Sequence, residues 1–469
     1  MTDPTPTPRP DVNAVLWAFV AFAIGEAVLV SNGNLHPTAI RWLTAGVVVG
    51  VGSFAVRRWP AVIASRAQSI FTCVVPVLLC VELAQSFTRM PGIYLRPTGP
   101  EPLFLFGACL ATLGVLVGGG LSDKPWLGRL HFPAVLVVFV VLGAWLIRSS
   151  PNPFIDVFVF QRDATTALIS GENPYALRYP DIYGNSPFYG EGLSVNGRLA
   201  FGFPYPPMSL YTVVPFQLAF GDYRYAQLAA MAGAAALMGY ARPGPVGKAI
   251  AALYLFMPRT LFVLEQGWTE PIVVFAVALV VFLSVRWPRW VPMSLGFLLV
   301  LKQYLVFALP LAWLVPGLKE GLSRRGRFAL EVLLPGLVSL PLALWSVKDF
   351  WFDVVALQVY QPFRVEALSY LAWWASEHGG EKPPTVLAFV AALIGVGLVL
   401  WRAPRTAAGF AGGLGLVMML FFAFNKQAFC NYYALVVGAF ACAAACSREE
   451  VVTPPDGPAP SVTTSPAAS

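Results

Sequence analysis

Charged residues are scarce in this sequence. Only 12% of the 469 residues are Asp, Glu, Lys or Arg, and 57% are hydrophobic, whereas soluble domains usually contain roughly 25% charged residues. This composition excludes an ordinary soluble protein. Because a spanning helix needs about 20 apolar residues, the chain is long enough to cross a membrane many times. The composition therefore predicts an all-α polytopic membrane protein.

The sequence is also poor in residues that bind metals or nucleotides. Its six cysteines lie in or at the ends of apolar runs, so we expect small buried residues and not a disulfide framework or a zinc site. The three histidines have no metal-ligand spacing. Acidic residues could still supply oxygen ligands to a divalent metal, but no spacing indicates one. The chain has no glycine-rich nucleotide-binding loop, so we expect an activated substrate to arrive through the membrane.

Apolar runs and basic residues together predict the topology. With the N-terminus in the cytoplasm, most basic loops fall inside and explain the net charge of +7 without a nucleic-acid partner. The segment 206–220 is short and contains Pro215, so we interpret it as re-entrant or interfacial. About fourteen spans result, with both chain ends inside. They lie near residues 12–30, 40–56, 67–84, 103–121, 132–148, 224–241, 249–264, 270–286, 291–302, 303–316, 328–346, 384–401, 406–423 and 428–446.

These spans divide the chain into four parts. A cytoplasmic tail (1–11) precedes a four-span N-terminal extension (12–131), and a larger membrane domain (132–446) precedes a Pro- and Ser-rich tail (447–469) that we expect to be disordered. The larger domain has two long external segments, 149–205 and 347–383, where we expect interfacial helices. Because polar clusters gather on this external side, we expect the functional site there.

The first external segment contains "FIDVFVFQRDATTALISGENPY" (154–175). Its apolar residues recur at helical spacing, which predicts an amphipathic helix on the membrane surface with Asp156 and Asp163 on one side. In one interpretation Asp156 only caps the helix and Asp163 is solvated. In the other, a carboxylate shielded from water acts as a general base towards a hydroxyl group. The adjacent Arg162 would then keep it ionised or bind an anion.

Two lysines interrupt apolar runs on the same predicted face. Lys302 lies within "LGFLLVLKQYLVFALPLAW" and Lys426 within "FAFNKQAFCNYY". Either could extend to the interface as an anchor. Since lysines in membrane spans usually mark function, the alternative is that both bind a lipid-linked phosphate. Arg364, in the aromatic segment 347–383, is a further candidate for contact with a polar substrate.

Several motifs in this order resemble the GT-C superfamily of integral membrane glycosyltransferases, and among these glycosyltransferase family 87, the actinobacterial polyprenyl-phosphomannose-dependent mannosyltransferases. The resemblance covers roughly residues 132–446. The motifs are Asp156 after a span, "ALISGENPY", "FGFPYPPMSLY", "EQGWTEP", "VLKQYLVFALPL", "QPFRVEALSYLAW" and "FNKQAFCNYY".

The resemblance implies an inverting transfer in which Asp156 deprotonates an acceptor hydroxyl that displaces polyprenyl phosphate. It implies a GT-C fold, a plasma-membrane location, no cofactor beyond the lipid-linked sugar, and a glycan or glycolipid acceptor of the cell envelope. Lys302, Lys426 and Arg162 would bind the donor phosphate, and Asp163 is the second carboxylate. The expected substrate-binding residues are Tyr205, Glu265, Gln266, Glu270, Gln303, Arg364 and Tyr432.

The N-terminal extension departs from the family pattern, in which the aspartate commonly follows the first span. Its role is not evident from the sequence. Two other functions remain open: a transporter or flippase of lipid-linked saccharides, which predicts ionisable groups near the bilayer midplane, and an assembly subunit without activity. The concentration of polar groups on one face favours the enzyme.

Overall fold

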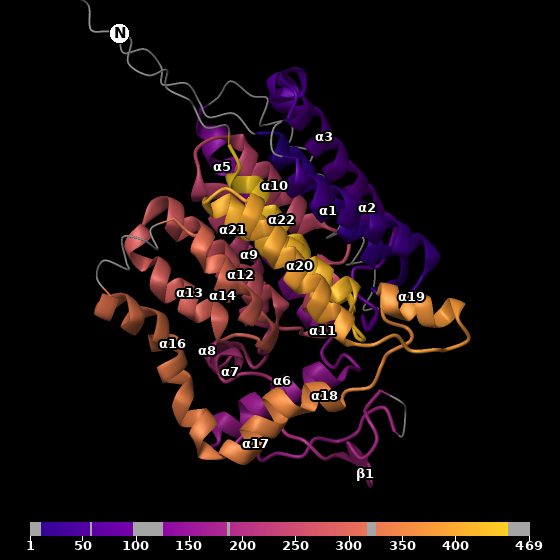
Figure 1. Cartoon of the computed structure of the whole chain (residues 1–469). Helices are drawn as coiled ribbons and strands as arrows, with labels where there is room; N and C mark the ends of the chain where they lie inside the picture. The colour runs from indigo at the N-terminus through magenta and orange to yellow at the C-terminus, as the bar shows by residue number, and fades with distance from the viewer. Residues whose placement is uncertain (1–10, 57–58, 97–124, 185–187, 317–324, 449–469) are drawn as a thin grey trace, which may run out of the picture.

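The protein is almost entirely helical, as expected (Figure 1). The computed structural model describes residues 11–56, 59–96, 125–184, 188–316 and 325–448, and within these ranges the only sheet is a hairpin of β1 (Ser194–Val195) and β2 (Arg198–Leu199). Five described helices are long and apolar enough to cross a membrane, or six if a bent pair counts as one span. The chain is therefore a membrane-embedded all-α protein. The predicted run at 103–121 and most of the two tails lie outside the described residues.

The N-terminal helices pack into the rest of the protein. They are α1 (Val12–Ser31), α2 (Pro37–Ala55) and α3 (Ala61–Thr88). Helix α1 is apolar on all sides and lies between α2 and α22 (Cys430–Cys446), while α3 packs against α1 and α10 (Pro245–Phe256). A helix that is apolar all round needs partners on every side. The extension is thus part of one packed body, joined directly to the C-terminal helix (Figure 1).

The helices of the larger domain surround a largely apolar core, in which a few polar side chains such as Gln227 and Glu270 are buried. Helix α21 (Ala407–Ala423) is buried along its whole length, between α20 (Val386–Arg402) and α22. Helix α12 (Glu270–Arg286) packs against α9 (Arg224–Ala241). Helix α10 and α11 (Thr260–Gln266) meet at a 52° bend. The other long helices are α5 (Pro125–Ser149) and α16 (Arg325–Trp345).

Two predicted spans are not continuous spanning helices. Helix α13 (Val291–Leu299) has nine residues, and the run after it consists of η2 (Gln303–Phe307), α14 (Ala308–Leu311) and η3 (Ala312–Leu314). The prediction that each crosses the bilayer alone is wrong, since a crossing helix needs about 20 residues. Lys302, in an extended conformation, separates the two pieces. This break places a polar side chain inside the protein.

The segments predicted to be external fold together at one end of the molecule, opposite the N-terminal label in Figure 1. These segments share a hydrophobic core that is separate from the core of the membrane helices. It is rich in aromatic residues, among them Phe160, Tyr179 and Phe201. Leu342 of the long helix α16 contributes to this core, and its other residues lie in short elements and loops. Its short elements are α6 (Asp156–Ile169), α7 (Met208–Tyr211), α8 (Val214–Phe220), α17 (Val347–Trp351), η4 (Phe352–Ala356) and α18 (Leu357–Tyr360), and α19 (Tyr370–Glu377) follows them.

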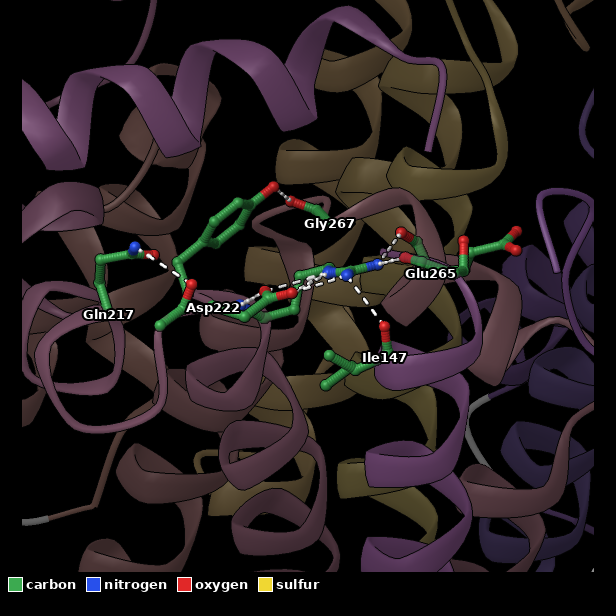
Figure 2. A network of polar contacts seen from close by, with 9 residues as sticks. Ile147, Gln217, Asp222, Glu265 and Gly267 are labelled. Atoms are coloured by element: carbon green, nitrogen blue, oxygen red, sulfur yellow. Dashed lines mark hydrogen bonds and ion pairs between the residues drawn. The ribbon is translucent and has the colours of Figure 1, made fainter. Parts of the chain in front are cut away.

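A buried arginine joins this end to the membrane helices (Figure 2). Arg224, fully buried at the start of α9, pairs with Asp222 at 2.7 Å between Nη2 and Oδ2. Its guanidinium also donates hydrogen bonds to the carbonyls of Ile147, Ser150 and Glu265 at 3.2, 2.8 and 3.1 Å. These carbonyls lie at or near the ends of α5 and α11, where a helix leaves carbonyl groups without partners. Arg224 therefore fixes the chain just before Asp156.

Replacing this arginine by lysine should destabilise the fold. In Arg224→Lys a single ammonium replaces the planar guanidinium, so we expect buried carbonyls to lose donors and the free energy of unfolding to fall by about 1–3 kcal/mol. Thermal unfolding in detergent measures the change. The control is Arg327→Lys, an exposed arginine paired with Glu331, because surface ion pairs contribute roughly 0–1 kcal/mol. Equal midpoints for the two variants would contradict the anchoring role.

Candidate functional site

Asp156 lines a cavity of about 440 Å³ at the junction of the membrane helices and the aromatic end. The start of α6, the loops around Tyr189 and Arg364, and the segment before α22 all contribute to its wall. Of the described residues that line it, Asp156 and Arg364 are charged, and most of the others are aromatic or carry amide groups. Polar pockets with aromatic walls are typical of small-molecule sites. The cavity is thus the candidate site.

The Asp156 carboxylate accepts hydrogen bonds at the start of α6. Ile155 is the N-cap residue and Asp156 the first helical residue, so the interpretation of Asp156 as an N-cap is wrong. Its Oδ1 accepts a hydrogen bond from the Val157 N–H at 2.7 Å, and its Oδ2 accepts one from the Tyr189 hydroxyl at 3.1 Å. The Tyr183 hydroxyl accepts from the Asp156 N–H at 3.2 Å. These bonds fix the carboxylate in the cavity wall.

Burial changes the acidity of this carboxylate. Removal from water raises the pKa of Asp156 above its usual value, while the two hydrogen bonds and the charge of Arg364 partly oppose this. The same burial raises the pKa of Tyr183 and Tyr189, so both stay neutral hydrogen-bonding groups. A carboxylate with a raised pKa that remains within reach of a ligand can accept a proton efficiently.

Arg364 is the cation of this site. Its guanidinium lies 4.2 Å from the ring centroid of Phe188 and 5.0 Å from that of Phe429. Its Nε donates to Glu366 Oε1 at 2.6 Å. Aromatic faces favour a flat guanidinium in this position. The prediction that Arg364 belongs to the site is consistent with this geometry.

The second predicted carboxylate lies elsewhere. Helix α6 forms as expected, but Asp163 does not line the cavity and pairs instead with Arg162 at 2.7 Å. Arg162 likewise lies outside the cavity. Seven residues separate Asp163 from Asp156 by ~10 Å along a helix, so a shared side does not mean a shared site. Both expectations, for Asp163 beside Asp156 and for Arg162 at the site, are wrong.

Lys302 lies behind the cavity wall with an acid that is distant in sequence. It is buried, with Nζ 3.3 Å from Glu270 Oε1 and 3.9 Å from the ring centroid of Tyr205. The same Glu270 oxygen accepts from the Tyr304 hydroxyl at 3.1 Å and from Asn431 Nδ2 at 3.2 Å. Lys302 therefore does not extend to the interface as an anchor. Glu270 holds it in place.

A second cavity, of about 570 Å³, contains Lys302. Its other walls are mainly apolar, and exposed side chains such as Val306 and Leu309 stand at its edge. Gln358 lines both cavities. Gln303 also lines the second cavity, and its Nε2 donates to the carbonyls of Pro204 and Val354 at 2.8 and 3.0 Å. The polar and the apolar cavity are thus neighbours.

Lys426 and Glu265 have structural partners instead of places in the cavity. Lys426 Nζ donates to the carbonyls of Val359 and Gln361 at 3.2 and 2.6 Å. Glu265 accepts from the backbone of Ile93 and Tyr94. Neither side chain lines the polar or the apolar cavity, so their roles in substrate binding stay predictions. Of the other candidates, Gln266, Tyr205 and Tyr432 line the polar cavity.

Sequence reasoning missed several polar residues of the cavity. Most lie in loops, where no periodic pattern marks their direction, while Gln358 lies in α18 and Asn431 in the first turn of α22. All reach the site through tertiary packing. Among the described residues, no three His, Cys, Asp or Glu side chains come together as a metal site. The missed residues are Asn32, Asn34, Tyr94, Tyr183, Tyr189, Gln358, Gln361, Gln427 and Asn431.

Comparison with known proteins gives no assignment. The chain matches no family model, no curated protein and no solved structure. The resemblance to glycosyltransferase family 87 accordingly stays a prediction. The function must be argued from the two cavities.

Proposed function

We propose that the protein is a GT-C-type glycosyltransferase that moves a sugar, mannose first among the candidates, from polyprenyl phosphate to a hydroxyl of a cell-envelope glycan or glycolipid. The observation that carries the proposal is the pairing of two cavities: a polar one with a buried carboxylate, and an apolar one with a buried lysine. A lipid-linked sugar needs such a pair. Its reacting sugar requires polar and aromatic contacts, and its lipid requires an apolar surface.

Asp156 is the base in this reaction. Its carboxylate takes the proton of the acceptor hydroxyl as the hydroxyl oxygen bonds to the anomeric carbon of the donor. The bond between that carbon and the phosphate oxygen breaks, and polyprenyl phosphate leaves with the electron pair. Attack opposite the leaving group converts a β-linked donor into an α-mannoside. A raised pKa suits Asp156 to this role, because a base with a pKa nearer to the working pH accepts a proton more readily.

The leaving phosphate requires positive charge at the boundary between the cavities. Lys302 Nζ lies beside the ring of Tyr205, which lines the polar cavity, and Lys302 itself lines the apolar cavity. Glu270 orients the ammonium group, and the ammonium retains donors for a phosphate oxygen. Fixed charge at the site where negative charge develops stabilises the transition state. Arg364, which lines the polar cavity, is the second cation available to the phosphate.

The direct test is product formation. Proteoliposomes with labelled polyprenyl-phosphomannose on the external face and a cell-envelope glycolipid extract should give a new labelled glycolipid whose sugar is α-linked. Enzymatic digestion with linkage-specific mannosidases identifies the linkage. Movement of label between leaflets without a new glycosidic bond would instead show a flippase, and the proposal would then fail.

The charge of Arg364 should set the pH dependence of this reaction. Asp156 must be ionised to act, so kcat/KM rises as pH increases through its pKa. Arg364 lowers that pKa. We therefore expect Arg364→Gln to raise the pKa of Asp156 and move the rising limb of the pH profile to higher pH.

The matched control for that profile is Arg162→Gln. Arg162 pairs with Asp163 outside the cavity. The rising limb of the kcat/KM profile of Arg162→Gln should therefore coincide with that of the unmodified protein. A limb that moves equally in both variants would contradict a specific effect of Arg364.

A further inference from the structure

Two loops of the N-terminal extension reach the Asp156 cavity. Asn32 and Asn34 in the turn between α1 and α2, and Ile93 and Tyr94 after α3, all line it. Asp156 itself lies more than sixty residues further along the chain, beyond α5. The extension thus supplies part of the wall of the candidate site.

The turn between α1 and α2 is held by backbone hydrogen bonds and by Asn34 Nδ2, which donates to the Ser31 carbonyl at 3.0 Å. The Leu35 N–H donates to the Glu366 carbonyl at 2.7 Å, and Asn34 forms a β-bridge with Ala367. Gly33 has φ +82° and lies against Cys430, where a Cβ would come within 2.3 Å of the backbone nitrogen. Only glycine permits this approach. The turn is therefore built to lie against the segments that carry Arg364 and Asn431.

The second loop is held equally firmly. Both carboxylate oxygens of Glu265 accept backbone hydrogen bonds, from Ile93 at 2.7 Å and from Tyr94 at 2.8 Å. The Tyr94 hydroxyl donates to the Phe154 carbonyl at 2.8 Å, two residues before Asp156. Charge-assisted bonds to a carboxylate are stronger than neutral ones. Glu265, which the sequence predicted to bind substrate, thus binds the N-terminal extension and holds this loop at the cavity.

The chemistry of this wall points to a neutral polar ligand. The described residues of the two N-terminal loops that line the cavity carry amide, phenol and aliphatic groups and no charge. The Asn32 side-chain oxygen has no hydrogen-bond partner among the described residues. Across the cavity stand further amides, including Gln266 and Gln427, and aromatic rings. Amides donate and accept at once, which matches sugar hydroxyls, and the described lining residues of these two loops include no cation for an anionic ligand.

We propose that the two N-terminal loops form a subsite for a neutral glycosyl unit of the acceptor, next to the hydroxyl that reacts. The identification of that unit as the acceptor rests on the proposed function. Asn32 and Asn34 are its specificity-determining residues, and Glu265 positions the opposite loop. The N-terminal extension is accordingly the part of the chain that selects the acceptor.

Ligand binding tests the subsite without any transfer. Full-length protein in nanodiscs of phosphatidylethanolamine and phosphatidylglycerol is titrated with methyl α-mannoside, with its uronic acid counterpart, and with dodecyl phosphate as a probe of the donor site. Saturation-transfer NMR and calorimetry measure affinity. Asn32→Gly is the variant, because Asn32 has φ +56° and glycine keeps that backbone. Asn196→Gly is the matched control, since Asn196 also has positive φ (+53°) but lies in the exposed β1–β2 turn.

We expect the neutral glycoside to bind, the uronic acid to bind more weakly, and Asn32→Gly to weaken glycoside binding about threefold to tenfold without changing dodecyl phosphate binding. Asn196→Gly should bind both probes normally. Unchanged glycoside affinity in both Asn32→Gly and the second variant Asn34→Ala would overturn the subsite. Absence of glycoside binding in the unmodified protein, with dodecyl phosphate still bound, would overturn the subsite alone. Failure of both probes would overturn the proposed function as well.

Discussion

Asp156→Asn should lose nearly all transfer activity while retaining its fold. Asparagine keeps the shape of the side chain. Its Oδ1 can still accept from the Val157 N–H, and its Nδ2 can donate to the Tyr189 hydroxyl oxygen, but it cannot take a proton. General-base catalysis typically contributes about 10²- to 10⁴-fold, and we expect a loss of that size in kcat. Incorporation of label from polyprenyl-phosphomannose measures it. The variant should not be less stable, because an amide in this buried position avoids the desolvation that raises the pKa of Asp156.

The control for this prediction lies on the same helix. Asp163→Asn changes the same residue type two turns away, where the carboxylate pairs with Arg162 outside the cavity. We expect its activity to stay within about threefold of the unmodified protein, since an exposed ion pair contributes little. Equal losses in the two variants would remove Asp156 as the base. Retained activity in Asp156→Asn would do so more directly.

The course of the helices was largely predictable from hydropathy. The apolar runs at 12–30, 224–241, 270–286 and 406–423 correspond closely to α1, α9, α12 and α21, because a long apolar run in lipid must form a helix. The predicted runs 291–302 and 303–316 do meet at the break at Lys302, but hydropathy could not show that neither run forms a full spanning helix. Runs on both sides are equally apolar, and what divides them is the ion pair with Glu270 and the hydrogen bonds of Gln303. These partners are distant in sequence.

The candidate site was predictable only in its charged residues and a few neighbours. Asp156 and Arg364 stand out because charge is rare beside apolar segments, and both line the cavity. The same reasoning also selected Glu265 and Lys426, whose side chains bind backbone groups outside the cavity, since scarcity of charge does not distinguish a ligand-binding group from one that holds a loop. Asn32 and Tyr94 gave no signal at all. Their place depends on how α1 packs against α22 and on the hydrogen bonds of Glu265.

Variants of the Lys302–Glu270 ion pair can distinguish a role of Lys302 in stability from a role in catalysis. Lys302→Met removes the cation and leaves a buried carboxylate without its charge partner, with only the Tyr304 hydroxyl and the Asn431 amide bound to it. Breaking one side of a buried pair typically costs about 3–5 kcal/mol. We expect a loss of that size in the free energy of unfolding, measured by denaturation in mixed micelles.

The double variant Glu270→Gln/Lys302→Met should recover most of that stability, because replacing both partners of a buried pair with neutral groups is often close to neutral. It should not recover transfer, since Lys302 then no longer provides a cation for the leaving phosphate between the two cavities. Lys426→Met is the control: Lys426 donates only to the carbonyls of Val359 and Gln361, so we expect it to retain most activity. A stable double variant that transfers sugar at the normal rate would show that Lys302 only balances Glu270. A stable double variant without transfer, beside an active Lys426→Met, would place the phosphate at Lys302 and make the apolar cavity the position of the donor lipid.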